Sequence, residues 1–531
     1  MKFKKIIILI LMMSISIVVS AQDAAFYRRY AEQGDKEAMF KLAQCYMYGN
    51  GGVEQDYNQA TLWLTKAAKK KYAPAEVLLA YCYLYGTGVM KDYHKAWELT
   101  SKAVKKDNAA AHYLMSQMYK QGFYVRQSNS AYVQFLRSAA QLGDDDAQVE
   151  LGKMYLSGDK DYNIARDERQ GVSLIQKSAD QNNGEALFEL GCAYRYGVGG
   201  LPQDENKAFE YIYKSAQTGF ANGIFETGLN YLYGIGTDVD YTEATRYISI
   251  AALHEIPNAY KVLGDILYYG YGGDVDFETA AEWYQKAVDV GYSNALVPLA
   301  RMYKYGIGVT QNETKGFQLY RQAADAGLAE GYAGVASCYA SGVGTTRNMS
   351  QAVANFKKAA EGGDAYSMYC LYYAYRHGDE GVSKDTQKAI DYLRQAVDAE
   401  YSDAIFALGV EYALGEILHE EKNNALSYIT KSADSGNAHA SAFLGACYYN
   451  GDWLVEKDYD KAFKYLNAAS QDIYSINSQE LLAEMYKDLG ACYRFGRGTE
   501  VDYSLAAYCT EQAAQYGDSS SFDAVKMLRD K

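Results

Sequence analysis

The chain has 531 residues, with 47 Gly, only 4 Pro and 54 Tyr, and its formal net charge is −14. Because 49% of the residues are hydrophobic and Pro is scarce, the composition excludes a disordered chain, a collagen and proline-rich linkers. The acidic balance disfavours nucleic-acid binding, since an acidic surface repels phosphate backbones. Many short helices that end at glycine turns are expected instead.

The first predicted element is an export signal over residues 1–21. Three lysines within residues 1–5 precede an apolar run over residues 6–19, and small residues surround a cleavage point after Ala21. The run is shorter than the roughly 20 residues of a membrane-spanning helix, so an uncleaved anchor is the weaker interpretation. Cleavage would remove three Lys and no acid, which changes the net charge from −14 to −17. We expect an exported protein, periplasmic or at the cell surface, without a stable membrane span.

After this signal, thirteen glycines recur at nearly constant spacing. They are Gly49, Gly86, Gly122, Gly158, Gly197, Gly234, Gly270, Gly306, Gly342, Gly378, Gly415, Gly451 and Gly496. Eleven of the twelve intervals are 36 to 39 residues long and the last is 45. This period predicts thirteen helix-turn-helix repeats over residues 37–518.

Each repeat is expected to contain two helices, which we name A and B. Helix A starts at a small residue eleven positions before the glycine, such as Ala38, and contains a Leu followed by Gly or Ala, which lets helices pack closely. It ends at the glycine, whose left-handed conformation reverses the chain. An Asp or Asn six or seven residues later, such as Asp240 or Asn312, is the predicted N-cap of helix B.

Single helices are expected at both ends of the array. Residues 22–36 reproduce the spacing of a helix B and predict an N-terminal capping helix. Residues 519–531 predict a lone helix A that caps the C-terminal end. Such caps are needed because the terminal repeats of a stacked array would otherwise expose their apolar faces.

The repeat pattern resembles that of the Sel-one-like repeat (SLR) family, a relative of tetratricopeptide repeats. The motif is A-x-x-x-L-G-x-x-Y-x-x-G-x-G, then Asp, then A-x-x-(aromatic)-x-x-x-A-A. The eighth repeat matches it most clearly, at Ala295, Leu299, Tyr303, Gly306, Gly308, Asn312, Tyr320, Ala323 and Ala324. The resemblance implies an all-α, right-handed superhelical α-solenoid that acts as an adaptor in protein complexes. We therefore expect a non-enzymatic scaffold that binds a partner protein or peptide on its surface.

Two turns that depart from the pattern contain apolar residues where polar ones are expected. Phe123 and Tyr124 replace the Gly-x-Gly turn of the third repeat, and Trp453 and Leu454 stand in the turn of the twelfth. These four residues are the candidate partner contacts. The alternative is drift in surface turns.

Tyrosines occupy two positions of the repeat. Those three residues before the glycine, such as Tyr194, are predicted to lie in the core with their hydroxyls at a polar edge. A second group stands directly before the glycine: Tyr48, Tyr85, Tyr196, Tyr233, Tyr269 and Tyr305. We interpret this pre-glycine position as the edge of the core. The alternative is an aromatic ladder that faces a ligand.

The sequence predicts no catalytic, cofactor-binding or metal-binding residues. Its six His lack zinc-site spacing, and Asp238-Val239-Asp240 begins like a calcium loop but lacks the required Gly and acid, so a capping role is favoured for Asp240. A cell-wall or β-lactam hydrolase remains an alternative, although Ser157-x-x-Lys160 is its only matching motif. A structural, self-assembling envelope protein is a further alternative.

Five of the eight Cys share one repeat position, which Met, Ala or Ile fills in several other repeats. Free Cys behaves as a small hydrophobe in such a core position, so mainly reduced, buried thiols are expected. Cys492 and Cys509, on the two helices of the last repeat, are the pair best placed to form a disulfide.

Overall fold

The computed structural model describes residues 24–378, 382–415, 422–451, 455–476 and 478–518. These residues form 27 α-helices and three short 3₁₀ helices, and the only β pairing among them is an isolated bridge between Asp159 and Ile164. The predicted signal (1–21) and the predicted C-terminal capping helix (519–531) lie outside the described residues.

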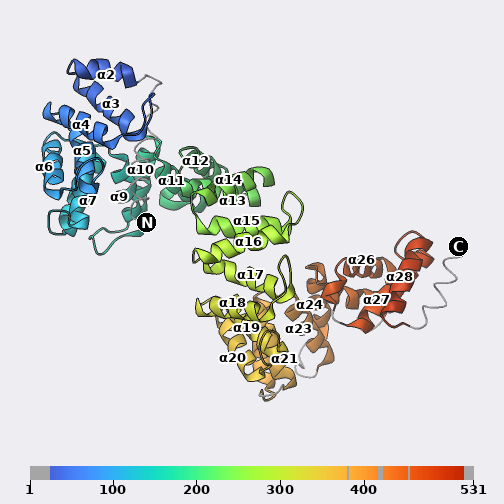
Figure 1. The fold of residues 1–531 in the computed structure, drawn as a ribbon. Coiled ribbons are helices and arrows are strands. Elements are labelled where there is room, and N and C mark those ends of the chain that lie inside the picture. The colour runs from blue at the N-terminus through green and yellow to red at the C-terminus, as the bar shows by residue number, and fades with distance from the viewer. Residues whose placement is uncertain (1–23, 379–381, 416–421, 452–454, 477, 519–531) are drawn as a thin grey trace. The chain divides into compact units, whose positions relative to one another are not determined.

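The chain divides into two compact units, residues 1–276 and 277–531, each described by itself (Figure 1). Unit 1 contains α2 (Ala24–Glu32), α3 (Lys36–Tyr48), α4 (Tyr57–Lys69), α5 (Ala73–Tyr85), α6 (Tyr93–Val104), α7 (Ala109–Gln121), α8 (Asn129–Gln141), α9 (Asp145–Ser157), α10 (Glu168–Ala179), α11 (Gly184–Tyr196), η1 (Val198–Gly200), α12 (Glu205–Gln217), α13 (Ala221–Tyr233), α14 (Tyr241–Leu253) and α15 (Pro257–Tyr269).

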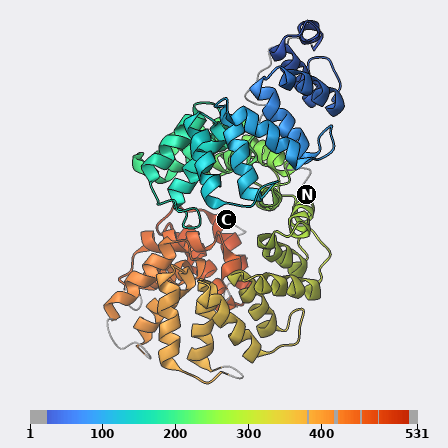
Figure 2. The ribbon, with the colours of Figure 1, turned by 90° about the vertical axis from the view of Figure 1, so that its left-hand side faces the viewer.

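Unit 2 contains α16 (Phe277–Asp289), η2 (Ser293–Ala295), α17 (Leu296–Tyr305), α18 (Glu313–Asp325), α19 (Ala329–Ser341), α20 (Met349–Glu361), α21 (Ala365–His377), α22 (Thr386–Asp398), α23 (Ser402–Leu414), α24 (Lys422–Asp434), α25 (Ala438–Asn450), α26 (Tyr459–Ala469), η3 (Ile473–Ser475), α27 (Gln479–Phe495) and α28 (Tyr503–Gln515). From α3 onward, odd-numbered helices are helices A and even-numbered helices are helices B. Within each unit, every helix packs on the next one in the chain (Figures 1 and 2).

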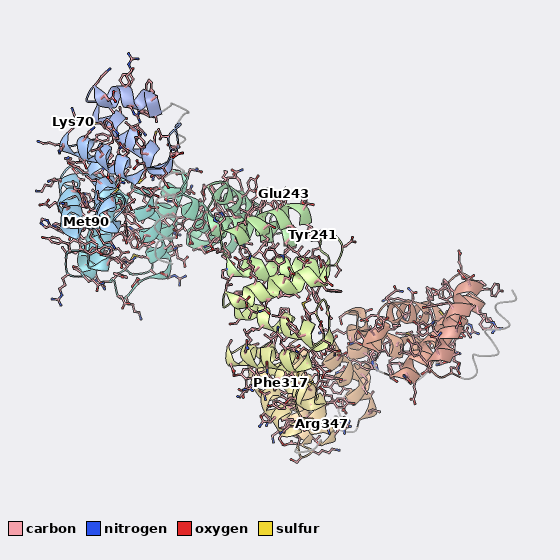
Figure 3. The ribbon with its side chains drawn as sticks, viewed as in Figure 1. Lys70, Met90, Tyr241, Glu243, Phe317 and Arg347 are labelled. Atoms are coloured by element: carbon pink, nitrogen blue, oxygen red, sulfur yellow. The ribbon has the colours of Figure 1, made fainter. Side chains whose placement is uncertain are left out.

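Helices B begin at the acidic or amide residues that the sequence predicted as N-caps. Asp240 accepts hydrogen bonds from the backbone N–H groups of Thr242 and Glu243, both at 3.0 Å, at the start of α14. Figure 3 labels Tyr241 and Glu243, which lie in the first turn of this helix. The same capping is present at Asp56, Asp92, Asp204, Asn312, Asn348, Asp385, Asp458 and Asp502. These caps satisfy N–H groups that have no partner inside the helix, so the calcium-loop alternative for Asp240 is not needed.

Eleven of the thirteen helices A begin two residues earlier than predicted, and six of these have an Asp or Asn N-cap that sequence reasoning missed. Helix α3 starts at Lys36 rather than Ala38, and the Asp35 carboxylate accepts from the Ala38 N–H at 2.7 Å. The equivalent caps are Asn108, Asp144, Asn183, Asp364 and Asn437. The small residue therefore marks a packing position in the first turn, not the start of the helix.

The turn glycines have the predicted left-handed conformation in twelve of the thirteen repeats. Gly158 differs (φ 70°, ψ 144°), and the bridge between Asp159 and Ile164 follows it. The second glycine of a Gly-x-Gly turn is required for a different reason. At Gly236 (φ +68°), a Cβ would lie 2.1 Å from the Glu205 carbonyl oxygen on the preceding helix B. Only glycine permits this approach between successive repeats.

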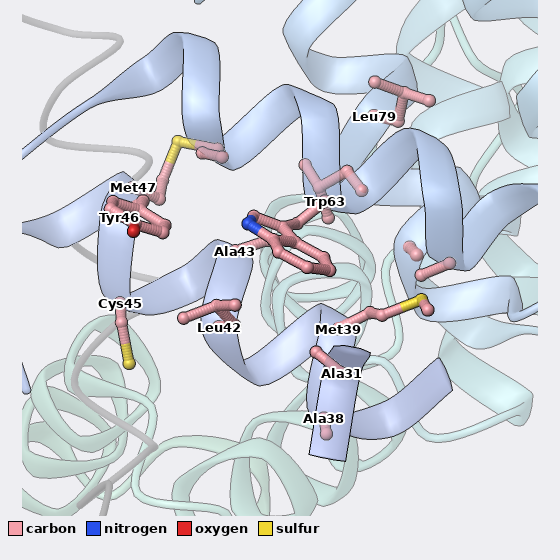
Figure 4. Packing of buried hydrophobic residues seen from close by; sticks show 14 of the residues in the cluster. Ala31, Ala38, Met39, Leu42, Ala43, Cys45, Tyr46, Met47, Trp63 and Leu79 are labelled. Carbon is pink, nitrogen blue, oxygen red and sulfur yellow. The ribbon is translucent and has the colours of Figure 1, made fainter. Parts of the chain in front are cut away.

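The core of each repeat lies between helix A and its neighbouring helices B. In the first repeats, Leu42 on α3 and Leu64 on α4 are fully buried, and Trp63 and Leu79 join the same cluster (Figure 4). Each such side chain stabilises the fold by roughly 1.5–3 kcal/mol. The small residue that follows the Leu of the repeat motif lets helix A pack closely on helix B. A Cβ at Gly191, for example, would lie 2.6 Å from the Ile212 side chain.

Helix α2 packs on α3 at the N-terminal end of the described chain. Ala24 and Ala31 are buried in the first core cluster, and the Ala24 N–H donates to the Gly51 carbonyl at 2.8 Å. This helix thus occupies the place that a preceding helix B would have, while residues 22–36 as the limits of a capping element stay a prediction.

Candidate protein-interaction surface

The pre-glycine tyrosines of four repeats are exposed, so their interpretation as a core edge is wrong. The exposed fractions are 70% for Tyr196, 57% for Tyr233, 57% for Tyr269 and 59% for Tyr305. The cause is helical geometry. Tyr194, the core tyrosine of the same helix, stacks on Tyr211 of helix B at 5.5 Å, and two residues later the helix has turned by about 200°. The pre-glycine side chain therefore points away from helix B.

Three of these residues form what we call the tyrosine row: Tyr196 on α11, Tyr233 on α13 and Tyr269 on α15. They occupy the same position on three successive helices A of unit 1. Around Tyr269 the aromatic surface widens, because its ring centroid lies 5.0 Å from that of Tyr268 and 5.6 Å from that of Tyr271.

A polar network joins the helices that present the tyrosine row. Arg195, next to Tyr196, forms an ion pair with Glu226 on α13. Its guanidinium also donates to the Asn230 side-chain oxygen at 2.6 Å. Asn230 is fully buried at a repeat position that Cys, Met or Ala fills in most repeats. This charged contact between two helices A fixes the segments on which Tyr196 and Tyr233 stand.

Helices A of unit 2 also expose aromatic side chains. Lys304 lies 5.0 Å from the ring centroid of the exposed Tyr305 on α17. Tyr366 and Tyr373 on α21 are exposed too, and the Tyr373 ring lies 4.4 Å from the His377 ring. Exposed aromatic residues on helices A are thus a feature of both units.

One face of helices A in repeats 2 to 4, which we call the closed face, contains a buried tyrosine close to carboxyl groups. Tyr81 is 9% exposed, and its pKa is raised well above the usual value by burial and by the negative charges of Asp144 and Asp146. Burial also raises the pKa of Asp144 to about 7 and, together with Asp145, that of Asp146 to about 6. Side chains two repeats apart therefore approach one another on this face.

The structure separates the two predicted contacts of the third repeat. Phe123 is half-buried against the neighbouring core and stacks on Tyr93 at 5.2 Å. Tyr124 is exposed, with φ 66°, and its ring contacts His94 at 5.0 Å. Phe123 thus anchors the turn, and Tyr124 is the accessible member. Trp453 and Leu454 lie outside the described residues.

The residues considered for catalysis, disulfide formation or metal binding make contacts that belong to the fold. The Ser157 hydroxyl donates to the Lys153 carbonyl at 3.1 Å, at the end of α9. Cys492 and Cys509 are buried as separate thiols, and burial raises the pKa of each to about 12. Six of the eight Cys are buried, while Cys192 and Cys370 are half-buried. In the described part of the chain, no three His, Cys, Asp or Glu side chains gather as metal ligands would.

None of the helices described in the structure combines the length and the apolar character that crossing a bilayer requires.

The fold and this surface define an all-α repeat protein whose helices A present exposed aromatic side chains. Comparison with known families then gives the particular family: the chain belongs to the Sel1 repeat family. Thirteen Sel1 repeats match at residues 36–72, 73–108, 109–144, 145–183, 184–220, 221–254, 257–292, 294–328, 329–364, 363–401, 402–437, 438–472 and 483–518. We number the repeats in this order. The predicted solenoid of thirteen repeats is confirmed, and such a fold is typical of protein-interaction scaffolds.

Solved structures include similar chains. A protective antigen of uropathogenic Escherichia coli strains that displays an SLR fold is 26% identical, with a TM-score of 0.57, over 96% of this chain and 97% of that chain. A Sel1 repeat protein from Oxalobacter formigenes is 25% identical over 59% of this chain and 92% of its own, with a TM-score of 0.39.

Among curated proteins, mouse DAP3-binding cell death enhancer 1 is 31% identical over 114 residues. The match covers 22% of this chain and only 20% of the mouse protein. The chain thus spans about a fifth of that relative's length.

Proposed function

We propose that this chain is an exported scaffold that binds a partner protein or peptide along its helices A, with the tyrosine row as the main contact in unit 1. The observation that carries the proposal is the exposure of Tyr196, Tyr233 and Tyr269 at one position of three successive repeats. The core does not use these rings, so the fold alone gives no reason for an aromatic residue there.

Tyrosine suits such a surface for physical reasons. It offers a large, rigid contact area with a polar hydroxyl, and aromatic residues are enriched where binding energy concentrates. One tyrosine per repeat, on a surface that continues from repeat to repeat, fits an extended peptide or a helix of the partner.

The test is affinity capture from the envelope fraction with the purified chain and with its Tyr196→Ser/Tyr233→Ser/Tyr269→Ser variant. The matched control is Leu253→Ser/Tyr474→Ser, which removes two exposed apolar side chains outside the row. We expect one reproducible partner whose capture falls at least about tenfold with the triple variant, as for loss of an aromatic contact cluster, and persists with the control. Equal capture by all three chains would exclude the row as the binding surface.

Export is supported by the basic start, the short apolar run and the small residues around Ala21. Amino-terminal sequencing of the protein from cells tests it. A mature chain that begins at Gln22 is expected, and a cytosolic chain that retains residues 1–21 would contradict export.

A further inference from the structure

A cavity of about 570 Å³ lies in unit 2, among two successive helices B (α20 and α22) and the helix A between them (α21). Its lining contains Ser350, Val353, Ala354, Lys357, Lys358, Glu361, Tyr375, Val382, Ser383 and Lys388. This volume falls within the range of small-ligand sites. Three of the ten side chains are lysines, although the chain as a whole has a net charge of −14.

Two of the lysines converge on one ring. The Lys357 ammonium on α20 lies 5.7 Å from the ring centroid of Tyr375, and the Lys388 ammonium on α22 lies 5.4 Å from it. Tyr375 is buried and stacks on Tyr392 at 5.9 Å, which gives the cavity a rigid aromatic wall. Two like charges at one ring repel each other, and an anion between them would remove that repulsion.

The charges around the cavity are only partly compensated. Lys388 lies 2.8 Å from Asp385, the N-cap of α22. Lys357 and Lys358 form no ion pair with any residue that the structure describes, and Glu361 is the one acid in the lining. Ser350 and Ser383 line the same space. The cavity therefore combines excess positive charge with neutral hydrogen-bond donors.

Equivalent positions in other repeats show which of the two lysines is particular to this cavity. The position of Lys388 is also lysine at Lys95, Lys207, Lys315 and Lys461, and each of these lies over the core tyrosine of its own repeat. In those four repeats the ninth residue of the preceding helix B is neutral: Thr65, Gln176, Gln285 and Thr430. In α20, the helix B that precedes the repeat of Lys388, the ninth residue is Lys357. Lys388 is thus a common structural feature of the repeat, and Lys357 converts it into a two-lysine cavity.

We propose that this cavity binds a small, multiply charged oxyanion, a phosphate or polycarboxylate compound, between Lys357 and Lys388, with Ser350 and Ser383 as further donors. Ammonium groups and hydroxyls are the donors that such oxygens accept from. The site uses helices B and the core tyrosine, whereas the tyrosine row uses the opposite sides of helices A, so the two proposals are independent.

The test is isothermal titration of the whole mature chain with pyrophosphate and, separately, with citrate at constant ionic strength. We expect saturable binding with a stoichiometry of one for at least one probe. Lys357→Gln should weaken it about fivefold and Lys357→Gln/Lys388→Gln about twentyfold, since each partly exposed charge contributes modestly. Binding of one probe alone supports the site and identifies the preferred oxyanion.

Lys315→Gln is the matched control, because it changes the same repeat position as Lys388 at a junction whose preceding helix carries Gln285. It should leave the titration unchanged, and circular dichroism should show that all variants are folded. The proposal is overturned if the wild-type chain binds neither probe saturably, or if Lys315→Gln weakens binding as much as Lys357→Gln. Partner capture by Lys357→Gln should stay at the wild-type level, so this result does not depend on the tyrosine row.

Discussion

Repeats 1 and 2 and repeats 5 to 7 have the same residue at the same position, in different surroundings. Tyr48 and Tyr85 are half-buried, and burial raises the pKa of Tyr48 to about 12. Tyr196, Tyr233 and Tyr269 are 57–70% exposed. The turn glycines that follow are left-handed in both regions, so the local backbone does not explain the difference.

The difference lies in what neighbouring repeats bring to the face of helix A. Tyr48 packs against the first core cluster, which includes Cys82 of the next helix A. In repeat 2, the Tyr85 ring stacks on the Tyr81 ring with centroids 6.3 Å apart, and the charges of Asp144, the last residue of repeat 3, and of Asp146 in repeat 4 act on Tyr81. A repeat position therefore sets the direction of a side chain, while residues one or two repeats away decide whether it is available to a partner.

The largest expected effect is one that both regions should share. A Cβ at Gly88 would lie 2.1 Å from the Tyr57 carbonyl oxygen, and one at Gly236 would lie 2.1 Å from that of Glu205. Gly88→Ala and Gly236→Ala should each lower the free energy of unfolding by about 3 kcal/mol or more, through left-handed strain and backbone overlap. Chemical denaturation measures this.

The control for both is Gly143→Ala, because Gly143 also has a positive φ (+96°) but nothing lies within 4 Å of its added Cβ. It should lose only about 1–2 kcal/mol, the strain term alone. If all three variants were equally destabilised, the close approach between repeats would not matter.

The pre-glycine tyrosines should differ in their contribution to stability. Tyr48→Ala should lower the free energy of unfolding by about 2 kcal/mol, because a half-buried ring leaves the core cluster. Tyr196→Ala should change it by less than about 0.5 kcal/mol, as expected for an exposed site. Equal losses in denaturant titrations would remove the distinction between the two regions.

The stability of the closed face, with Asp144 and Asp146, should depend on pH. The folded-state pKa values of Asp144 (about 7) and Asp146 (about 6) exceed the usual 3.8, so the folded chain retains protons that the unfolded chain has lost. Their contribution to stability is present at pH 4 and is lost as the pH rises towards 7. Asp144→Asn/Asp146→Asn should therefore match the wild type at pH 4 and be at least about 1 kcal/mol more stable at pH 8. Thermal unfolding at the two pH values checks this, and a variant less stable than the wild type at pH 8 would contradict it.

The smallest effect concerns lysines that cover core tyrosines. Lys95 lies 5.3 Å from the ring centroid of Tyr83, and Lys207 lies 5.4 Å from that of Tyr194. Because this geometry is the same in the two regions, Lys95→Ala and Lys207→Ala should both lower the unfolding free energy by about 0.5 kcal/mol. A clear difference between them in paired denaturation curves would show that the regions differ in their cores as well as on their surfaces.

Most of the architecture could be predicted because it depends on local sequence features that recur in each repeat. The glycine period gave the number of repeats, and Asp or Asn after each turn gave the starts of helices B, as at Asp240 and Asn312. The caps of helices A were missed because their spacing from the small residue was not considered, although Asp35 and Asp364 stand at the same distance from it.

The candidate surface was predicted less well. The exposure of Tyr196 could have been found from the 200° rotation that separates it from the core tyrosine Tyr194. The burial of Tyr48 in the same position could not, because it depends on contacts with other repeats. The pair Lys357 and Lys388 could not be found from the sequence either, since residues 31 apart come together only because two successive helices B border the same cavity.

The most direct measurement is nitration of tyrosines by tetranitromethane, mapped by mass spectrometry with and without the captured partner. In the free chain, Tyr196, Tyr233 and Tyr269 should react well before Tyr48 and Tyr85. Bound partner should protect the three residues of the row and leave Tyr474 reactive. Reaction of Tyr48 as fast as Tyr196, or a partner that protects Tyr474 and not the row, would contradict the account.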